Sequence, residues 1–477
     1  MSVTVDVAVV GAGPAGLAAA VAAAEAGARV AVVDAGNQPG GQFWRHAPET
    51  VQRQAADVQA DGHGHHGWNT YLDLRARFDA AQHAGRITYL PGLQVWMAER
   101  SEDGFVLRTT PAVASAGAAP VTVTADRLVL CPGGYDRQLP VPGWDLPGVL
   151  AAGGIQAFIK ANGVLPGKRF VIAGTGPFLL PVAAGIAEAG GKVLAVLESS
   201  APSAWLPHLA AASGVPGKAL EGAEYAAAFA RHRIPYRTRS IVTEVLGSDR
   251  ASGVRTARVD PAGRVRPGTE RVYGDVDVVG FGWGFTPQME LPVSLGVETR
   301  LDADGSLVGV VDDRQQSSVP GLYLAGEVTG VGGATLAVLE GLAAGAAAAR
   351  PDPGVPVKPP AAIARHRRFA QAMHQAHPVP AAWQDWLTPD TTVCRCEEVT
   401  AGDITEARED LGARDVRSLK SFTRAGMGWC QGRVCGFAAA CLGAGPGEAP
   451  GAGSLAGSAK RPLAAPVGIG ELAALDG

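Results

Sequence analysis

Residues 7–16 decide the fold, and they read Val7-Ala8-Val9-Val10-Gly11-Ala12-Gly13-Pro14-Ala15-Gly16. The pattern is a buried strand that enters a helix through a G-x-G-x-x-G turn, as in dinucleotide-binding folds. Gly11 permits the tight turn, Gly13 lets a pyrophosphate approach the backbone, and Gly16 lets helix and strand pack closely. A second strand, 29–33, ends in Asp34, whose carboxylate can bind ribose hydroxyls. We therefore predict a dinucleotide site at a helix N-terminus; a glycine-rich turn before an ordinary core helix is the alternative.

The sequence around this motif favours FAD over NAD. The stretch 39–42, Pro-Gly-Gly-Gln, resembles the flavin-contacting turn of flavoproteins with two dinucleotide domains. Residues 128–134 resemble their second FAD-side strand and turn, and 321–327 resemble their closing motif, in which an acidic residue, usually Asp, holds the ribityl chain. The resemblance assigns to the FAD site Gly41, Gln42, Gly326 and Glu327.

A second glycine turn repeats the arrangement at 170–179, but Leu179 takes the place of the third glycine. A strand follows and ends at Glu198, in register with Asp34. In pyridine-nucleotide oxidoreductases this half binds NAD(P)H, which would assign Gly174, Gly176 and Glu198 to a nucleotide site. We expect Leu179 to push helix and strand apart, and Glu198 to repel a 2′-phosphate. NAD(H), another adenine nucleotide and a purely structural half all stay open.

Four of the six cysteines lie in two close pairs, separated by one and by four residues. Four thiolates of this kind hold iron–sulfur clusters, and the glycines around the second pair let backbone N–H groups approach the sulfurs. A structural zinc site is the alternative. The spacing also resembles the BFD-like [2Fe-2S] domain. The expected cluster ligands are Cys394, Cys396, Cys430 and Cys435, and the cations expected to offset the cluster's charge are Arg395, Lys420, Arg424 and Arg433.

Two other groups of residues are expected to be ordinary. Cys131 stands alone in the sequence, so it is expected to be a small buried residue rather than half of a redox pair. His63, His65 and His66 could bind a metal ion, but a solvated loop is the expected structure.

Charge and length limit the class of protein. A net charge of −4 over 477 residues gives no reason to expect nucleic acid or an anionic membrane as a partner. The stretch 7–24 has no charged residue, yet no Lys or Arg precedes it and glycines interrupt it, so it is not expected to be a membrane span or signal peptide. We expect a soluble cytoplasmic protein.

Strand, glycine turn and helix alternate at 5–33, 170–198 and 322–349, which predicts an α/β fold with parallel sheets covered on both faces. We predict two Rossmann-like dinucleotide-binding domains of the glutathione-reductase-like kind and a small C-terminal BFD-like domain. The expected segments are 1–150 with 271–350 (a discontinuous FAD-binding domain), 151–270 (the NAD-like domain), 351–390 (a Pro-rich linker and a helix), 391–445 (the BFD-like domain) and 446–477 (a flexible tail).

A flavoprotein followed by such a module resembles the large FAD subunits of opine oxidase, hydrogen cyanide synthase and D-hydroxyproline dehydrogenase. Residues 137–143, 282–288 and 325–333 carry further parts of this resemblance. It implies a separate D-amino-acid-oxidase-like FAD subunit that takes a hydride from a substrate C–N bond, and in some cases a small ferredoxin-like subunit. The present chain would relay electrons, because a flavin accepts two electrons and a [2Fe-2S] cluster carries one. We find no residue set for amine oxidation and expect no catalytic residue.

Three functions are therefore considered. The first is an electron-relay subunit of a heteromeric FAD-dependent amine or amino-acid dehydrogenase, acting on substrates of the opine, hydroxyproline or glycine type. The second, motivated by Glu198, is a self-sufficient NADH-dependent reductase that passes electrons to a ferredoxin or oxygenase. The third, motivated by Glu327 and the altered second turn, is a non-catalytic assembly or nucleotide-sensing subunit.

Overall fold

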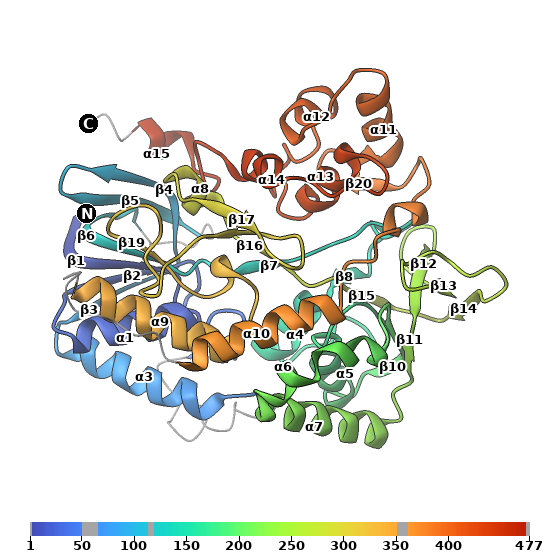
Figure 1. Ribbon diagram of the computed structural model, residues 1–477, viewed down its shortest axis with the longest axis horizontal. Coiled ribbons are helices and arrows are strands. Elements are labelled where there is room, and N and C mark those ends of the chain that lie inside the picture. The colour runs from blue at the N-terminus through green and yellow to red at the C-terminus, as the bar shows by residue number, and fades with distance from the viewer. Residues whose placement is uncertain (1, 50–64, 113–118, 351–360, 474–477) are drawn as a thin grey trace.

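The computed structural model describes residues 2–49, 65–112, 119–350 and 361–473. Figure 1 shows two sheet-based domains side by side, a small helical domain above the second one, and a C-terminal segment that runs back over the first.

The first sheet carries the N-terminal motif at the carboxyl end of its central strand. Strand β1 pairs in parallel with β2 and β6, so that Val9 lies opposite Val32 and Val129. These strands are rich in β-branched residues and buried on both faces, as a parallel sheet requires. The strands in order are β3 (Ile87–Pro91), β2 (Val30–Asp34), β1 (Ser2–Val10), β6 (Thr122–Leu130), β5 (Gly104–Pro111) and β4 (Leu93–Ser101), with β19 (Leu322–Leu324) also paired to β6.

This sheet is not wholly parallel, because β4 and β5 form an antiparallel hairpin that extends β6. One face of the sheet is covered by long helices. The other face packs against residues of the hairpin, of α8 and of α14. On the helical face two helices approach closely, since a Cβ at Gly341 would lie 2.1 Å from the carbonyl oxygen of Ala15. The helices here are α1 (Pro14–Glu25), α3 (Trp68–His83) and α9 (Ala334–Ala349); α8 spans Glu290–Ser294.

The second sheet repeats the parallel arrangement and corrects a predicted boundary. Strand β15 lies beside β9, with Phe281 opposite Ala173, so this domain continues beyond residue 270 to about Gly282. The apolar run 278–282 is a buried central strand of the second sheet. The strands in order are β11 (Tyr236–Thr238), β10 (Lys192–Glu198), β9 (Arg169–Gly174), β15 (Val278–Gly282) and β8 (Val149–Ala151). The helices are α4 (Ala152–Asn162), α5 (Leu179–Glu188), α6 (Leu209–Ser213) and α7 (Pro216–His232), and η1 (Pro202–His208) precedes α6.

Smaller sheets complete the two domains. A ribbon of two antiparallel strands joins them, and in it Tyr135 lies opposite Thr286. The ribbon consists of β7 (Gly134–Asp136) and β16 (Phe285–Pro287). The others are β12 (Ser240–Leu246) with β13 (Gly253–Arg258) and β14 (Arg271–Gly274), and β17 (Thr299–Leu301) with β18 (Leu307–Gly309); η2 (Glu327–Thr329) follows β19.

The expected helix after the Pro-rich stretch is present as α10 (Ala361–Ala376), whereas the stretch 351–360 itself lies outside the described residues. In Figure 1, α10 runs from the first domain toward the second. Arg367 on this helix reaches back to the buried carboxylate of Glu340 on α9. This ion pair holds α10 against α9 of the first domain.

The cysteine-rich domain packs mainly on the second domain. Their apolar side chains form one continuous core, in which the rings of Trp283 and Trp386 lie 5.5 Å apart. Thr400 begins α11 with a reciprocal capping box to Asp403. The elements are η3 (Trp383–Trp386), β20 (Thr392–Cys394), β21 (Val399–Thr400), α11 (Ala401–Glu409), α12 (Val416–Thr423) and α13 (Gly436–Ala444).

The prediction of a flexible tail is wrong for residues 446–473. Helix α14 (Ala452–Ala459) buries Leu455 against the first domain, and α15 (Ile469–Ala473) follows it. The backbone N–H of Ala464 donates to the carbonyl of Trp96 on β4 at 2.7 Å. Small side chains allow close contact with a neighbouring surface, so composition alone misled the prediction. No helix in the described part of the chain is long and apolar enough to cross a bilayer.

Candidate functional site

The first glycine turn has the backbone that its sequence requires. Gly11 has φ +93°, and a Cβ there would lie 2.3 Å from the carbonyl oxygen of Cys131. A Cβ at Gly16 would lie 1.7 Å from the carbonyl oxygen of Gly11. Pro14 is the first residue of α1, so the free N–H groups of that helix follow directly after Gly13. The turn can therefore receive a pyrophosphate at a helix N-terminus.

Two segments far away in the sequence lie on this turn. A Cβ at Gly41 would meet the Cα of Gly13 at 2.7 Å, and a Cβ at Gly326 would meet the Cβ of Ala15 at 3.0 Å. Gln42, beside Gly41, accepts a hydrogen bond from the guanidinium of Arg45. The fold therefore brings the 39–42 turn, the closing motif and the glycine turn close together.

The two acidic residues expected at this site have different surroundings. Burial raises the pKa of Asp34, while the backbone N–H of Ala12 donates to its carboxylate. Burial also raises the pKa of Glu327, to about 7. The Oε2 atom of Glu327 is buried and has no hydrogen-bond partner among the described residues. The carboxylate also accepts a hydrogen bond from the backbone N–H of Gly333, so its Oε2 atom is the acceptor that a hydroxyl of a bound ligand can satisfy.

The second glycine turn donates hydrogen bonds to the carboxylate of Glu198, at the end of the following strand. The backbone N–H of Gly176 donates to Glu198 at 2.8 Å, and the hydroxyl of Thr175 donates to the same carboxylate at 3.0 Å. His377, just after α10, lies with Nδ1 3.6 Å from Glu198, and Trp205 donates to its Nε2 at 3.0 Å. Glu198 is thus in register with Asp34, but its carboxylate already accepts hydrogen bonds within the turn and His377 lies over it. Sequence reasoning missed this cover, because His377 is remote from the turn along the chain.

Leu179 does not force helix and strand apart, contrary to our expectation. It is fully buried and packs on Gly282 of β15, which has no side chain and leaves room for it. Helix α5 begins only at Leu179, three residues after Gly176, whereas α1 begins directly after Gly13. The helix N-terminus is therefore set back from the second turn.

The four cysteines form two contacting pairs. The thiol of Cys394 hydrogen-bonds with that of Cys435, and the thiol of Cys396 with that of Cys430. Cys394 ends β20 and Cys435 caps α13, so ordered elements hold both. Among the described residues, no three His, Cys, Asp or Glu side chains converge closely enough to hold a single metal ion. Two pairs of thiolates are the donor set that a dinuclear iron centre uses, two ligands to each iron.

Backbone N–H groups point at the first pair, as expected for a site that holds thiolates. The pKa of Cys394 is lowered to about 5, first by the hydrogen bond with Cys435 and then by the N–H groups of Gly426, Glu397 and Cys396. A Cβ at Gly428 would lie 2.1 Å from the Cβ of Cys396, so only glycine fits there. These features fit a negatively charged cluster.

Two of the cations expected around the cysteines, Arg395 and Arg424, contact other side chains or backbone groups. The guanidinium of Arg395 stacks 3.9 Å from the ring of Trp144 and donates to its carbonyl. Arg424 pairs with Glu397 at 2.7 Å. The side chain of Lys420 lines an open groove near the cysteines.

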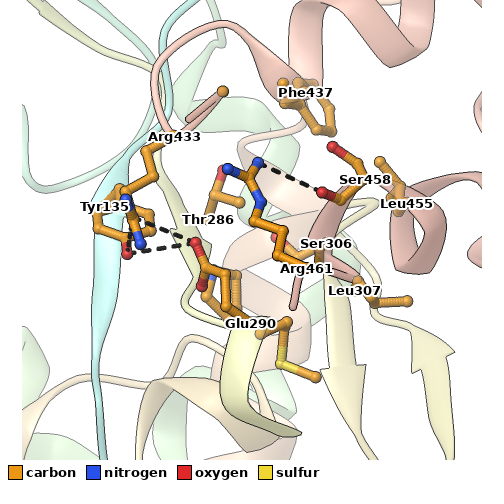
Figure 2. Close-up of a pocket in the computed structure, with 15 residues that line it drawn as sticks. Tyr135, Thr286, Glu290, Ser306, Leu307, Arg433, Phe437, Leu455, Ser458 and Arg461 are labelled. Carbon is orange, nitrogen blue, oxygen red and sulfur yellow. Dashed lines mark hydrogen bonds and ion pairs between the residues drawn. The ribbon is translucent and has the colours of Figure 1, made fainter. Parts of the chain in front are cut away.

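Arg433, inside the Cys430–Cys435 loop, connects this loop to the first domain. Its Nε donates to the hydroxyl of Tyr135 at 2.6 Å and lies 3.2 Å from Glu290. Figure 2 shows these side chains around a small pocket of about 80 Å³, with Arg461 of the C-terminal segment on its other side. Tyr135 directly follows the 128–134 strand and turn. Two expected cofactor regions therefore meet at this pocket, which sequence reasoning did not find.

Two minor expectations can also be placed. Cys131 is buried, and burial raises its pKa, as expected for an unreactive residue. His65 contacts the carbonyl of Arg45, and His66 lies 3.8 Å from Glu224. His63 lies outside the described residues.

Comparison with protein families agrees with this geometry. Residues 5–349 match the model for pyridine nucleotide-disulphide oxidoreductases, and residues 392–441 match the model for the BFD-like [2Fe-2S] binding domain. These matches identify the cofactors as FAD and a [2Fe-2S] cluster.

Several curated proteins are similar over most of the chain. One opine oxidase subunit of Rhizobium meliloti is 34% identical over 90% of this chain and 80% of its own length. The HcnB subunit of the hydrogen cyanide synthase of Pseudomonas protegens is 32% identical over 90% of this chain and 89% of its own. The alpha subunit of the sarcosine oxidase of Corynebacterium sp. strain P-1 is 28% identical over 91% of this chain but only 41% of its own.

A solved structure shows the same fold. The L-proline dehydrogenase of P. horikoshii superposes with a TM-score of 0.66 at 19% identity, covering 99% of this chain and 80% of that one.

Proposed function

Since the chain belongs to the pyridine nucleotide-disulphide oxidoreductase family and carries a BFD-like [2Fe-2S] domain, it is an FAD-dependent oxidoreductase, and we propose that it is the electron-relay subunit of a heteromeric amine or amino-acid dehydrogenase. The similar curated proteins are named as subunits, which supports a multi-subunit assembly. A D-amino-acid-oxidase-like partner would oxidise a substrate of the opine, hydroxyproline or glycine type. The present chain would take the electrons and pass them on singly.

One observation carries the proposal: a hydrogen bond joins the cysteine loop 430–435 to the first domain, which carries the predicted FAD site. Arg433, two residues before Cys435, bonds to Tyr135, which directly follows the FAD-side turn. When bound, FAD accepts two electrons and releases them singly, and a [2Fe-2S] cluster carries one. A direct contact between the two cofactor regions is what such a relay needs.

The residues of the chain have holding roles in this proposal. The turn Gly11–Gly16 and the N-terminus of α1 would bind the pyrophosphate, and Asp34 would bind ribose hydroxyls. Glu327 would accept a hydrogen bond from the ribityl chain, which satisfies its buried Oε2 atom. Cys394, Cys396, Cys430 and Cys435 would bind the two irons.

The second glycine turn supports a structural role for the second domain. Its carboxylate, Glu198, already accepts hydrogen bonds from Gly176 and Thr175, and His377 lies over it. A bound NAD(H) would have to displace these contacts. The register of Glu198 with Asp34 is the observation that keeps the NADH-dependent reductase as a second candidate.

The test uses the purified holoprotein under anaerobic conditions. Mixing with NADH, glycine, proline, hydroxyproline or an opine is expected to leave the flavin absorbance unbleached. The same chain, used as bait in an extract of its own organism, is expected to retain a second flavoprotein. Fast bleaching by NADH would replace the relay with the reductase, and strong oxidation of an amino acid by the isolated chain would contradict both.

A further inference from the structure

The surface beside the cysteine loop is strongly basic. An open groove of about 720 Å³ lies between α12 and the segment after α14. Among the described residues, five cations line it and no acidic residue does: they are Arg417, Lys420, Arg424, Lys460 and Arg461. The chain as a whole is acidic, with a net charge of −4. The groove is therefore positively charged, although the molecule as a whole carries a net negative charge.

The sequence of α12 builds one wall of this groove. Arg417 and Lys420 lie three residues apart, which places them on one face of the helix, and Arg424 is the residue that ends it, in the left-handed conformation. Val416 and Leu419 of the same helix are buried in the apolar interior. Lys460 and Arg461 supply the other wall from the C-terminal segment, whose ordering the composition did not predict. Two separate segments thus place their cations on one surface.

Apolar side chains are exposed where the groove meets the cysteine ligands. Met427 lines the groove and is 53% exposed, and Trp429 beside Cys430 is 84% exposed. Cys396 is itself exposed and lies against Gly428. Exposed aromatic and methionine side chains within a rim of charge are typical of protein docking surfaces. A site for a small anion alone would not need them.

We infer that this groove docks an acidic one-electron carrier protein, which receives electrons from the cluster side of the chain. The inference rests on the proposed relay function and names its acceptor by chemistry: a carrier with carboxylates around its own redox centre. Within the described part of the chain Arg424 is paired with Glu397 and Arg417 interacts with Asp415, whereas no ion pair includes the side chain of Lys460, which also lines the groove. Each transfer oxidises the reduced cluster by one electron and reduces the redox centre of the carrier by one electron. No bond is formed or broken.

Charge makes the inference testable, because the local and the overall charge predict opposite effects of salt. A groove that attracts the carrier makes transfer fast at low ionic strength and slower as salt screens it. A net charge of −4 acting alone would repel an acidic carrier, so salt would speed the reaction. The sign of the salt effect therefore distinguishes docking at the groove from a collision with the whole molecule.

The experiment uses the holoprotein, reduced by light and a deazaflavin, and mixed with oxidised acidic [2Fe-2S] ferredoxin as the probe. The rate of ferredoxin reduction is expected to fall roughly tenfold between about 20 and about 500 mM salt. The double variant R417E/K460E is expected to lose roughly tenfold of the low-salt rate. The matched control, R271E/K192E, changes the same charge on the exposed surface of the second domain and is expected to behave as wild type.

Binding is measured separately from electron transfer. Calorimetry with redox-inert gallium-substituted ferredoxin is expected to give a roughly tenfold weaker Kd for R417E/K460E and an unchanged Kd for the control. Reduction of neutral menadione should be equal in all three proteins, and the cluster absorbance should be unchanged. If the variant loses its cluster, the inference is tested by the salt dependence of ferredoxin reduction by the wild-type protein alone.

Three outcomes would overturn the inference: a rate that is independent of salt or rises with it, an equal loss in the control variant, or tight binding of inorganic tripolyphosphate without ferredoxin binding. The last result would make the groove a small-anion site. Failure of the relay itself would appear differently, as a cluster that stays oxidised after the flavin is reduced and before any carrier is added.

Discussion

The guanidinium Nε of Arg433 lies 2.6 Å from the hydroxyl oxygen of Tyr135, and this hydrogen bond joins the cysteine loop to the ribbon between the two larger domains. Both side chains are partly buried, and Glu290 lies 3.2 Å from the same Nε atom. Hydrogen bonds to charged groups contribute more than neutral ones. The contact therefore fixes the position of the cluster loop relative to the FAD-type domain.

Removing this hydroxyl should loosen the cysteine-rich domain. Tyr135→Phe is expected to cost about 1.5–3 kcal/mol, because it leaves a charged donor with one partner fewer. Hydrogen exchange should become faster in the Cys430–Cys435 loop, while FAD and iron contents stay unchanged. Tyr236→Phe is the control, since Tyr236 is 40% exposed on β11. Equal protection of the loop in both variants would contradict a fastening role.

The cysteine set predicts which thiols are needed for the cluster. Cys394→Ser, Cys396→Ser, Cys430→Ser and Cys435→Ser should each lower iron and acid-labile sulfide and abolish or alter the electron paramagnetic resonance signal of the reduced protein. Cys441→Ser is the matched control, because Cys441 is a buried cysteine of the same domain outside the two pairs. A chain that contains zinc and no sulfide, or a Cys441 variant that loses the cluster, would refute this assignment.

Most of the architecture could be predicted from local patterns. The strand, turn and helix at β1, Gly11–Gly16 and α1 are specified by neighbouring residues, and so is the grouping of the cysteines into two short motifs. What could not be predicted depends on contacts distant in sequence. Examples are Arg433 with Tyr135, His377 over Glu198, and the C-terminal segment against β4. The boundary at 270 failed because β15 belongs to the second sheet through pairing, which composition does not reveal.

Glycine positions test the FAD site. Gly41→Ala should lower FAD content, because Gly41 has φ +60° and its new Cβ would meet the Cα of Gly13 at 2.7 Å. Gly185→Ala is the control within a helix: it has open space around it and should keep FAD and gain up to about 1 kcal/mol of stability. FAD is measured by absorbance after gel filtration. Equal FAD content in both variants would argue against the 39–42 turn as part of the site.

The buried Glu327 predicts a pH dependence of the apoprotein. Its pKa is raised from 4.5 to about 7 by burial, so the folded state binds this proton more tightly than the unfolded state. Stability should therefore fall as pH rises from about 4.5 to 7, by up to about 3 kcal/mol from this group. Glu327→Gln should remove that part of the decline, as followed by thermal unfolding from pH 5 to 8. A parallel decline in both proteins would assign the effect to other groups.

The central claim is that electrons reach the cluster of this chain from a partner subunit. The most direct test is electron paramagnetic resonance of the cluster in the complex purified from the native organism, compared with the isolated holoprotein, each mixed anaerobically with a panel of imino acids and opines. We predict that one of these substrates gives the signal of a reduced [2Fe-2S] cluster in the complex and none gives it in the isolated chain. A reduced cluster in the isolated chain, or a cluster that stays oxidised while the complex turns over, would contradict the relay.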